Sequence, residues 1–145
     1  MIAGGGMPLK ENNRTKWPVK GGAISVQPGW FQGHSKALFY INMGINGPDE
    51  SAPPNMSHIL VPPFQVIGPT NNEYQGQFCL PQVPMPVNLT LEVGHNVTLQ
   101  VIEVAQHGAA LYNVRTLLPV LRRSQADTYY SAWMSLSSNQ RTSWK

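Results

Sequence analysis

The chain has 145 residues, of which only 12% are charged, and it contains 13 glycines and 13 prolines. This length suits one domain with its own hydrophobic core. So few charges and so many turn-forming residues exclude long, solvated surface helices. An all-β domain made of short strands is therefore predicted.

The formal net charge of +3 is distributed unevenly along the chain. Residues 1–113 carry five basic and six acidic side chains, a net charge of −1, whereas residues 114–145 carry five basic side chains against Asp127 alone, a net charge of +4. The basic character belongs to the C-terminal part and does not extend over the predicted domain. No nucleic-acid partner is predicted on this ground.

Several short segments have the alternation of apolar and polar residues that is typical of strands. The strongest is residues 36–44, in which both faces are partly apolar, as in a central strand that is covered on both sides. Pro62-Pro63 is expected to end the strand before it, because proline cannot donate to a ladder of hydrogen bonds. The other strands predicted in this part of the chain are residues 23–26, 56–61 and 75–80.

Residues 89–93 and 97–105 both alternate, and Gly94-His95-Asn96 lies between them. This pattern predicts a hairpin with a three-residue loop. The apolar phase changes at Val101-Ile102, so a β-bulge is predicted there. Six or seven short strands at this spacing predict a β-sandwich.

One feature of the sequence favours a secreted protein, and two other features do not fit one. Four glycosylation sequons stand in the chain, at Asn13, Asn55, Asn88 and Asn96, and such acceptors lie on the surface of secreted proteins. Neither a signal peptide nor a transmembrane run is recognisable in the sequence. Cys79 is the single cysteine, which for a secreted domain suggests a missing disulfide partner.

Three segments resemble signatures of the fungal copper-acquisition-factor-like proteins, a secreted family related in fold to the lytic polysaccharide monooxygenases. They are RTKWPVKGGAISV at residues 14–26, GQFCLP at residues 76–81 and GAALYN at residues 108–113, in the family's order and spacing. The resemblance implies an immunoglobulin-like β-sandwich that is glycosylated and often held at the cell surface by a GPI anchor. It also implies copper binding through a histidine brace made of an N-terminal His, a second internal His and an Asp. Amine and imidazole nitrogens in a flat array suit Cu(II).

Carried over to this sequence, the resemblance makes His34 the internal copper ligand. The N-terminal His has no counterpart, Gly4 stands where the family has a Cys, and Val114-Arg115 stand where it has Cys-Ala-Asp. Residues 1–113 are therefore expected to be a truncated sandwich with an incomplete site and weak copper binding. Residues 114–145 are expected to be a non-family tail that is disordered or forms fortuitous structure, which would leave an open sheet edge beside residues 97–105.

The predicted function is extracellular or cell-surface copper acquisition, with copper as the partner and polysaccharide or the membrane surface as further candidates. No independent active site is recognisable, so an enzyme is not predicted. The alternatives are a copper-dependent oxidase of the polysaccharide monooxygenase type and a metal-free carbohydrate-binding module that uses Trp30 and Phe31. His34 without its partner ligands is expected to be a solvated loop residue, and the other three histidines are expected to be surface residues: His58, His95 and His107.

Overall fold

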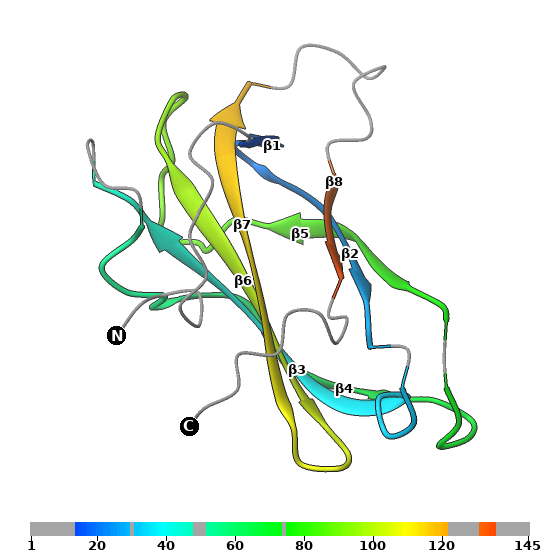
Figure 1. The fold of residues 1–145 in the computed structure, drawn as a ribbon. Helices are drawn as coiled ribbons and strands as arrows, with labels where there is room; N and C mark the ends of the chain where they lie inside the picture. The colour runs from blue at the N-terminus through cyan, green and yellow to red at the C-terminus, as the bar shows by residue number, and fades with distance from the viewer. Residues whose placement is uncertain (1–13, 30, 48–51, 74, 122–130, 136–145) are drawn as a thin grey trace.

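The computed structural model describes residues 14–29, 31–47, 52–73, 75–121 and 131–135, the last of these as backbone only (Figure 1). Every regular element in this part of the chain is a strand. The strands are β1 (Thr15–Pro18), β2 (Gly21–Gln27), β3 (Lys36–Ile45), β4 (His58–Ile67), β5 (Phe78–Pro84), β6 (Val97–Ala105), β7 (Ala110–Val120) and β8 (Ser131–Ser135).

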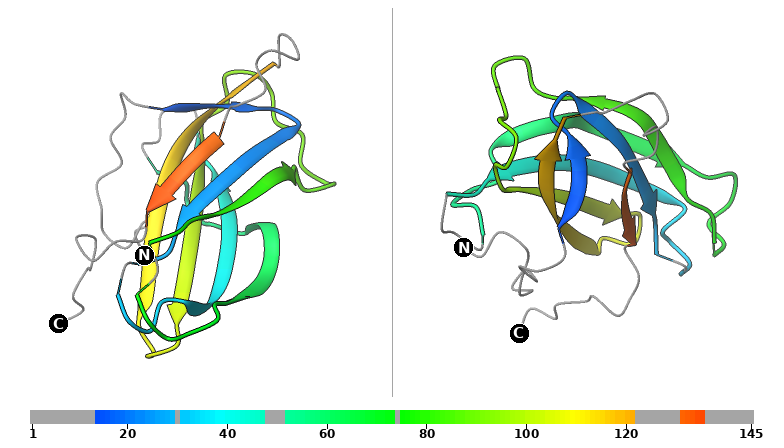
Figure 2. Two further views of the ribbon diagram at one scale, coloured as in Figure 1. Left: turned by 90° about the vertical axis from the view of Figure 1, so that its right-hand side faces the viewer. Right: turned by 90° about the horizontal axis from the view of Figure 1, so that it is seen from above.

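The strands form two sheets that face each other (Figure 2), so the predicted all-β sandwich is confirmed. The larger sheet has the order β1-β7-β6-β3-β4, and the smaller has the order β5-β2-β8. The core between them is aliphatic and aromatic, with Phe39 in ring contact with Phe64 and Phe78. Its largest fully buried apolar side chains are Trp17, Phe39, Ile24, Ile41, Met43, Leu99 and Leu117.

Strand β6 is the centre of the larger sheet and lies between β3 and β7. Its register with both neighbours runs without a shift, so the predicted bulge at Val101-Ile102 is wrong. The alternate residues from Val97 to Ala105 all point inward and are buried, and this inward row includes Glu103. The change of apolar phase that suggested a bulge arises because a carboxylate occupies one inward position.

Prolines lie within the two edge strands on one side of the sandwich. Strand β4 continues through Pro62-Pro63, so the prediction that these residues end the strand is wrong. Strand β5 contains Pro81 and Pro84. Both strands are outermost in their sheets, where the missing N–H group of a proline can face away from the neighbouring strand.

The predicted hairpin strand at residues 89–93 is also wrong, since residues 85–96 form turns and irregular structure. Leu91 is buried in the core and Leu89 packs against it, so the apolar alternation reflects core contacts of a loop. Gly94 has a φ of +92°, the conformation expected of a glycine in a turn. The antiparallel partners of β6 are instead β3 and β7.

Strand β7 continues past residue 113, where the boundary of the domain was predicted. Leu117 is fully buried and pairs with Val97 of β6 on one side and Thr15 of β1 on the other. The expected open edge beside residues 97–105 is therefore wrong, because β7 covers it. Further along, β8 pairs in parallel with β2 in the smaller sheet. The segment after residue 113 thus supplies strands to both sheets.

Candidate metal centre

The candidate site lies at one end of the larger sheet, where the β2–β3 loop meets the β6–β7 turn (Figure 1). The backbone N–H of Gln106 donates hydrogen bonds to the carbonyls of Gly33 and Lys36, at N–O distances of 3.1 and 3.0 Å. The turn itself is closed by hydrogen bonds from Ala105 N to Ala109 O and from Gly108 N to Ala105 O. The hydrogen bonds of Gln106 thereby hold the β2–β3 loop against the β6–β7 turn, although the two segments are far apart in the sequence.

His34 lies in this loop and is buried, with 5% of its surface exposed. The expectation of a solvated loop histidine is therefore wrong. Its Nδ1 lies 3.2 Å from Oε1 of Glu103, which projects inward from β6. A carboxyl group at one ring nitrogen fixes the orientation of an imidazole and directs its other nitrogen, here Nε2, away from that carboxyl group.

His107 lies in the β6–β7 turn and is exposed as a whole, as predicted, but its ring faces His34. The two Nε2 atoms are 2.9 Å apart, and the ring planes meet at 63° with 4.8 Å between centroids. The absence of a side chain on Gly33 makes this approach possible. A Cβ atom at that position would lie 2.4 Å from Cδ2 of His107, and Gly33 has a φ of +91° that favours glycine.

Glu103 is fully buried, and one of its carboxylate oxygens, Oε2, has no hydrogen-bond partner. Burial raises the pKa of this carboxyl from 4.5 to about 8, while a hydrogen bond from the backbone of Gly29 acts in the opposite direction. The sequence carried a signal for this residue, namely an acid at an inward position of a buried strand. It carried none for the meeting of His34 and His107, which are 73 residues apart.

The donor set of this cluster suits a transition metal, because imidazole nitrogen is a good ligand for copper and zinc. Glu103 lies on the Nδ1 side of His34 and so is placed to support a ligand, not to be one. Across the described residues, no group of three or more His, Cys, Asp or Glu side chains is arranged to hold a metal ion. Within the described residues, this cluster therefore provides two imidazole nitrogens as possible metal ligands, namely Nε2 of His34 and Nε2 of His107.

The other predicted site residues do not join this cluster. Asn55 and Asn88 are exposed and Asn96 is half-buried. Glycosylation of these three residues stays a prediction, and Asn13 lies outside the described residues. Cys79 is exposed on β5. Trp30 is also outside the described residues, so the predicted aromatic pair can be followed only at Phe31, which is 42% exposed with its ring 6.3 Å from that of His34.

The two remaining histidines lie elsewhere. His58 begins β4. His95 is exposed and forms a loose pair with the exposed Glu92, at 3.9 Å.

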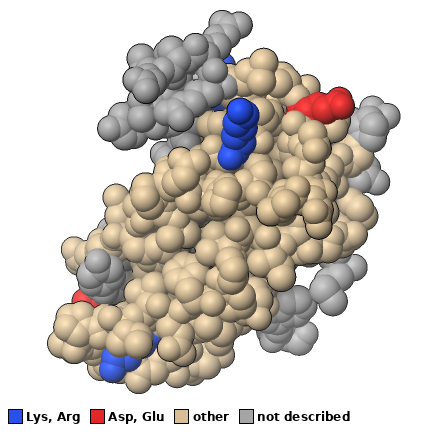
Figure 3. Space-filling model, turned by 180° about the vertical axis from the view of Figure 1, so that it is seen from behind, with Lys and Arg blue, Asp and Glu red and all other residues tan. Residues whose placement is uncertain are grey.

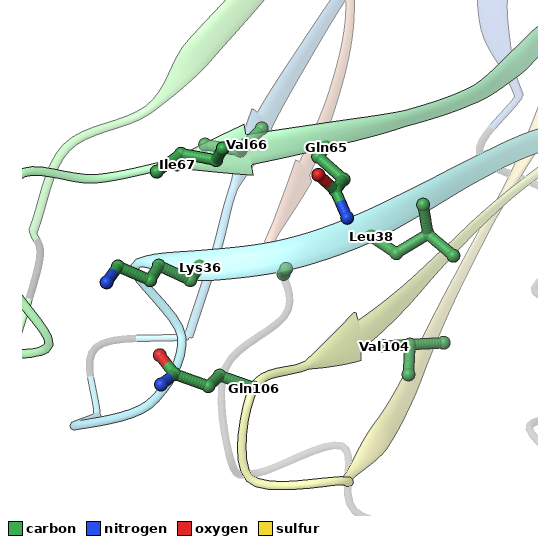
Figure 4. Close-up of a pocket in the computed structure, with 8 residues that line it drawn as sticks. Lys36, Leu38, Gln65, Val66, Ile67, Val104 and Gln106 are labelled. Atoms are coloured by element: carbon green, nitrogen blue, oxygen red, sulfur yellow. The ribbon is translucent and has the colours of Figure 1, made fainter.

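A shallow pocket lies beside the cluster, on the outer face of the larger sheet (Figure 4). Leu38 and Val104 form its apolar floor, and Lys36, Gln65 and Gln106 supply polar groups at its margin. It contains no imidazole or carboxylate, so it is not a metal site. The face of the molecule seen in Figure 3 carries only a few scattered charges, without a continuous basic patch.

Comparison with known proteins decides the family. The sequence profile described as copper acquisition factor BIM1-like matches residues 3–116. The chain belongs to this BIM1-like family. The matched segment extends three residues beyond Asn113 into β7, in agreement with the continuous strand.

Curated relatives of this BIM1-like chain come from filamentous fungi. It is 62% identical over 109 residues to lytic polysaccharide monooxygenase-like protein X325 of Aspergillus fumigatus, covering 75% of this chain and 44% of the relative. Identity is 61% over 109 residues to a lytic polysaccharide monooxygenase-like protein of Emericella nidulans, covering 75% and 43%. The chain is 55% identical over 111 residues to the X325 protein of Hypocrea jecorina, and this match covers 75% of the chain and 47% of the relative.

The chain thus spans less than half the length of each of these relatives. No solved structure matches it. Within the described residues, no helix has the length and apolar character needed to cross a membrane.

Proposed function

We propose that this BIM1-like chain is the copper-binding part of a protein that acquires copper at the outside of the cell. His34 is the residue that carries the proposal, because the family resemblance implies that it is the internal copper ligand and its ring contacts buried Glu103. When bound, copper would supply a redox-active Lewis acid. The chain's own residues would bind it and hold it at the end of the sandwich.

The position of Glu103 supports a ligand role for His34. Metal-binding histidines commonly donate their second ring N–H to a carboxyl oxygen, which fixes the tautomer and the orientation of the coordinating nitrogen. The Nδ1–Oε1 distance of 3.2 Å fits such a donation. A histidine that served packing alone would not require a buried carboxylate, since burying a carboxyl group is costly.

The extracellular setting belongs to the same proposal. It rests on the fungal copper-acquisition family and on the exposed sequon asparagines Asn55 and Asn88, where a glycan would not disturb the core. Attachment through a GPI anchor, and contact with the cell wall or membrane, would be properties of the longer protein. Tryptic mapping of glycans on secreted material tests this part, and unmodified Asn55 and Asn88 would count against it.

Oxidation of a polysaccharide is the second candidate, favoured by the printed names of the relatives, which are monooxygenase-like. It requires an open substrate face next to the metal. Product analysis after incubating the copper-loaded, full-length protein with polysaccharide and a reductant separates the two functions. Soluble oxidised sugars would favour the oxidase, and their absence alongside copper binding would favour acquisition.

Copper binding is tested by titrating the metal-free chain with Cu(II) and recording visible absorption and tryptophan fluorescence. His34→Ala is expected to weaken binding at least about tenfold. His95→Ala is the matched control, because His95 also pairs with a glutamate but is exposed. Equal binding by the wild type and His34→Ala would overturn the proposal.

A further inference from the structure

We propose that His107 is a second nitrogen ligand, so that His34 and His107 together form a two-imidazole copper site at the β6–β7 turn. This inference rests on the proposed function and adds a ligand that lies outside the brace expected from the family resemblance. The site would take a late first-row transition metal ion that prefers imidazole nitrogen, and copper is the proposed occupant.

The positions of the two Nε2 atoms fit one shared metal ion. Nitrogen ligands lie about 2.0 Å from a bound metal, and two of them at a right angle are therefore about 2.8 Å apart. The observed Nε2–Nε2 distance is 2.9 Å. The rings are inclined at 63° and not stacked.

A neutral pair of imidazoles at this distance also forms an N–H···N hydrogen bond. In the metal-free chain, one proton between the rings can hold them in the arrangement that a metal would need. Copper would then take the place of that hydrogen bond, with the Nε2 proton passing to solvent and the ring proton of His107 carried on Nδ1. The contact therefore fits a preorganised site. In the metal-free chain a proton lies between the two Nε2 atoms, and in the copper-bound chain the metal would join them.

Backbone hydrogen bonds hold the loop that carries His34 against the turn that carries His107. Gln106, the residue before His107, is bound to the carbonyls of Gly33 and Lys36, the residues on either side of the His34-Ser35 segment. Gly33 lies directly under the ring of His107, where any side chain would displace it. A turn that served only to join β6 to β7 would not require this contact.

The two ligands differ in exposure, and this difference favours copper transfer over permanent storage. His34 is buried and fixed by Glu103, whereas His107 is exposed. An ion held between them would be open to solvent on the His107 side. A donor or acceptor molecule could therefore reach it, and water or that partner would complete the coordination.

The test uses the full chain with Cu(II) alone as the probe. Electron paramagnetic resonance counts the coordinated nitrogens, and a titration gives the affinity. The wild type is expected to show at least two imidazole nitrogens, and His107→Ala is expected to lose one and to bind at least about tenfold more weakly. His95→Ala, in another exposed turn, should match the wild type in both measurements.

A second readout does not depend on copper redox chemistry. In nitrogen-correlated NMR of the histidine rings with Zn(II), the Nε2 signals of His34 and His107 should shift together at one equivalent of metal. Unchanged affinity and nitrogen count in His107→Ala, with His34→Ala impaired, would overturn this inference and leave the proposed function standing. Failure of the wild type to bind copper would overturn both. His107→Gln repeats the test with a side chain of similar size should the alanine variant unfold.

Discussion

Replacing Leu117 with alanine tests whether the segment beyond residue 113 belongs to the folded domain. The side chain is fully buried between β1 and β6. The substitution removes three carbon groups, and at about 0.8 kcal/mol for each buried CH₂ the lost transfer free energy is about 2 kcal/mol. The cavity left behind adds to this, for a total of about 3 to 4 kcal/mol.

The free energy of unfolding is measured by urea denaturation followed by intrinsic fluorescence, and the melting temperature should fall by about 10 °C or more. Leu121→Ala is the matched control, because Leu121 lies just past the end of β7 and is 66% exposed. Its effect is expected to stay within about 0.5 kcal/mol. A Leu117→Ala variant as stable as the wild type would refute the inclusion of this segment in the core.

Two further predictions concern the candidate site. Gly33→Ala should lower the free energy of unfolding in urea more than Gly94→Ala does, although both residues have φ near +90° and share a backbone strain of about 1 kcal/mol. The reason is that a methyl group at Gly33 meets the ring of His107, whereas Gly94 has open space. Equal losses in the two variants would contradict the contact between Gly33 and His107. For Glu103, the folded chain retains its proton up to a pKa of about 8 and the unfolded chain releases it near 4.5. The free energy of unfolding of the metal-free chain should therefore decrease as pH rises between these values, by at most about 5 kcal/mol. Glu103→Gln should remove most of this slope in unfolding titrations from pH 4.5 to 8.5, and an unchanged slope would show that another group causes it.

The architecture could be predicted from the sequence wherever a strand buries alternate apolar side chains. Strand β3 follows the predicted segment 36–44 closely, because its inward residues are all hydrophobic. The same rule failed for residues 89–93, where Leu89 and Leu91 reach the core from a loop. Periodicity reports contact with the core and does not by itself report a hydrogen-bonded ladder.

The site was predictable only in part. The resemblance to the copper-acquisition proteins made His34 a candidate ligand, but its burial beside Glu103 depends on the packing of a loop against a turn. His107 shows no local spacing to another histidine, and its contact with His34 arises from the topology that places the β6–β7 turn over Gly33. Contacts between residues so far apart in sequence follow from tertiary structure and not from a motif.

The parallel pairing of β1 with β7 has a consequence for the order in which the chain can fold. Thr15 lies opposite Leu117, about 100 residues later in the sequence. Strand β1 therefore remains without this partner until about 100 further residues have been synthesised. Closure of so long a loop is entropically costly, and we expect refolding on the millisecond-to-second timescale. Stopped-flow refolding from urea measures this rate, and completion within microseconds would show that the β1–β7 pairing does not limit folding.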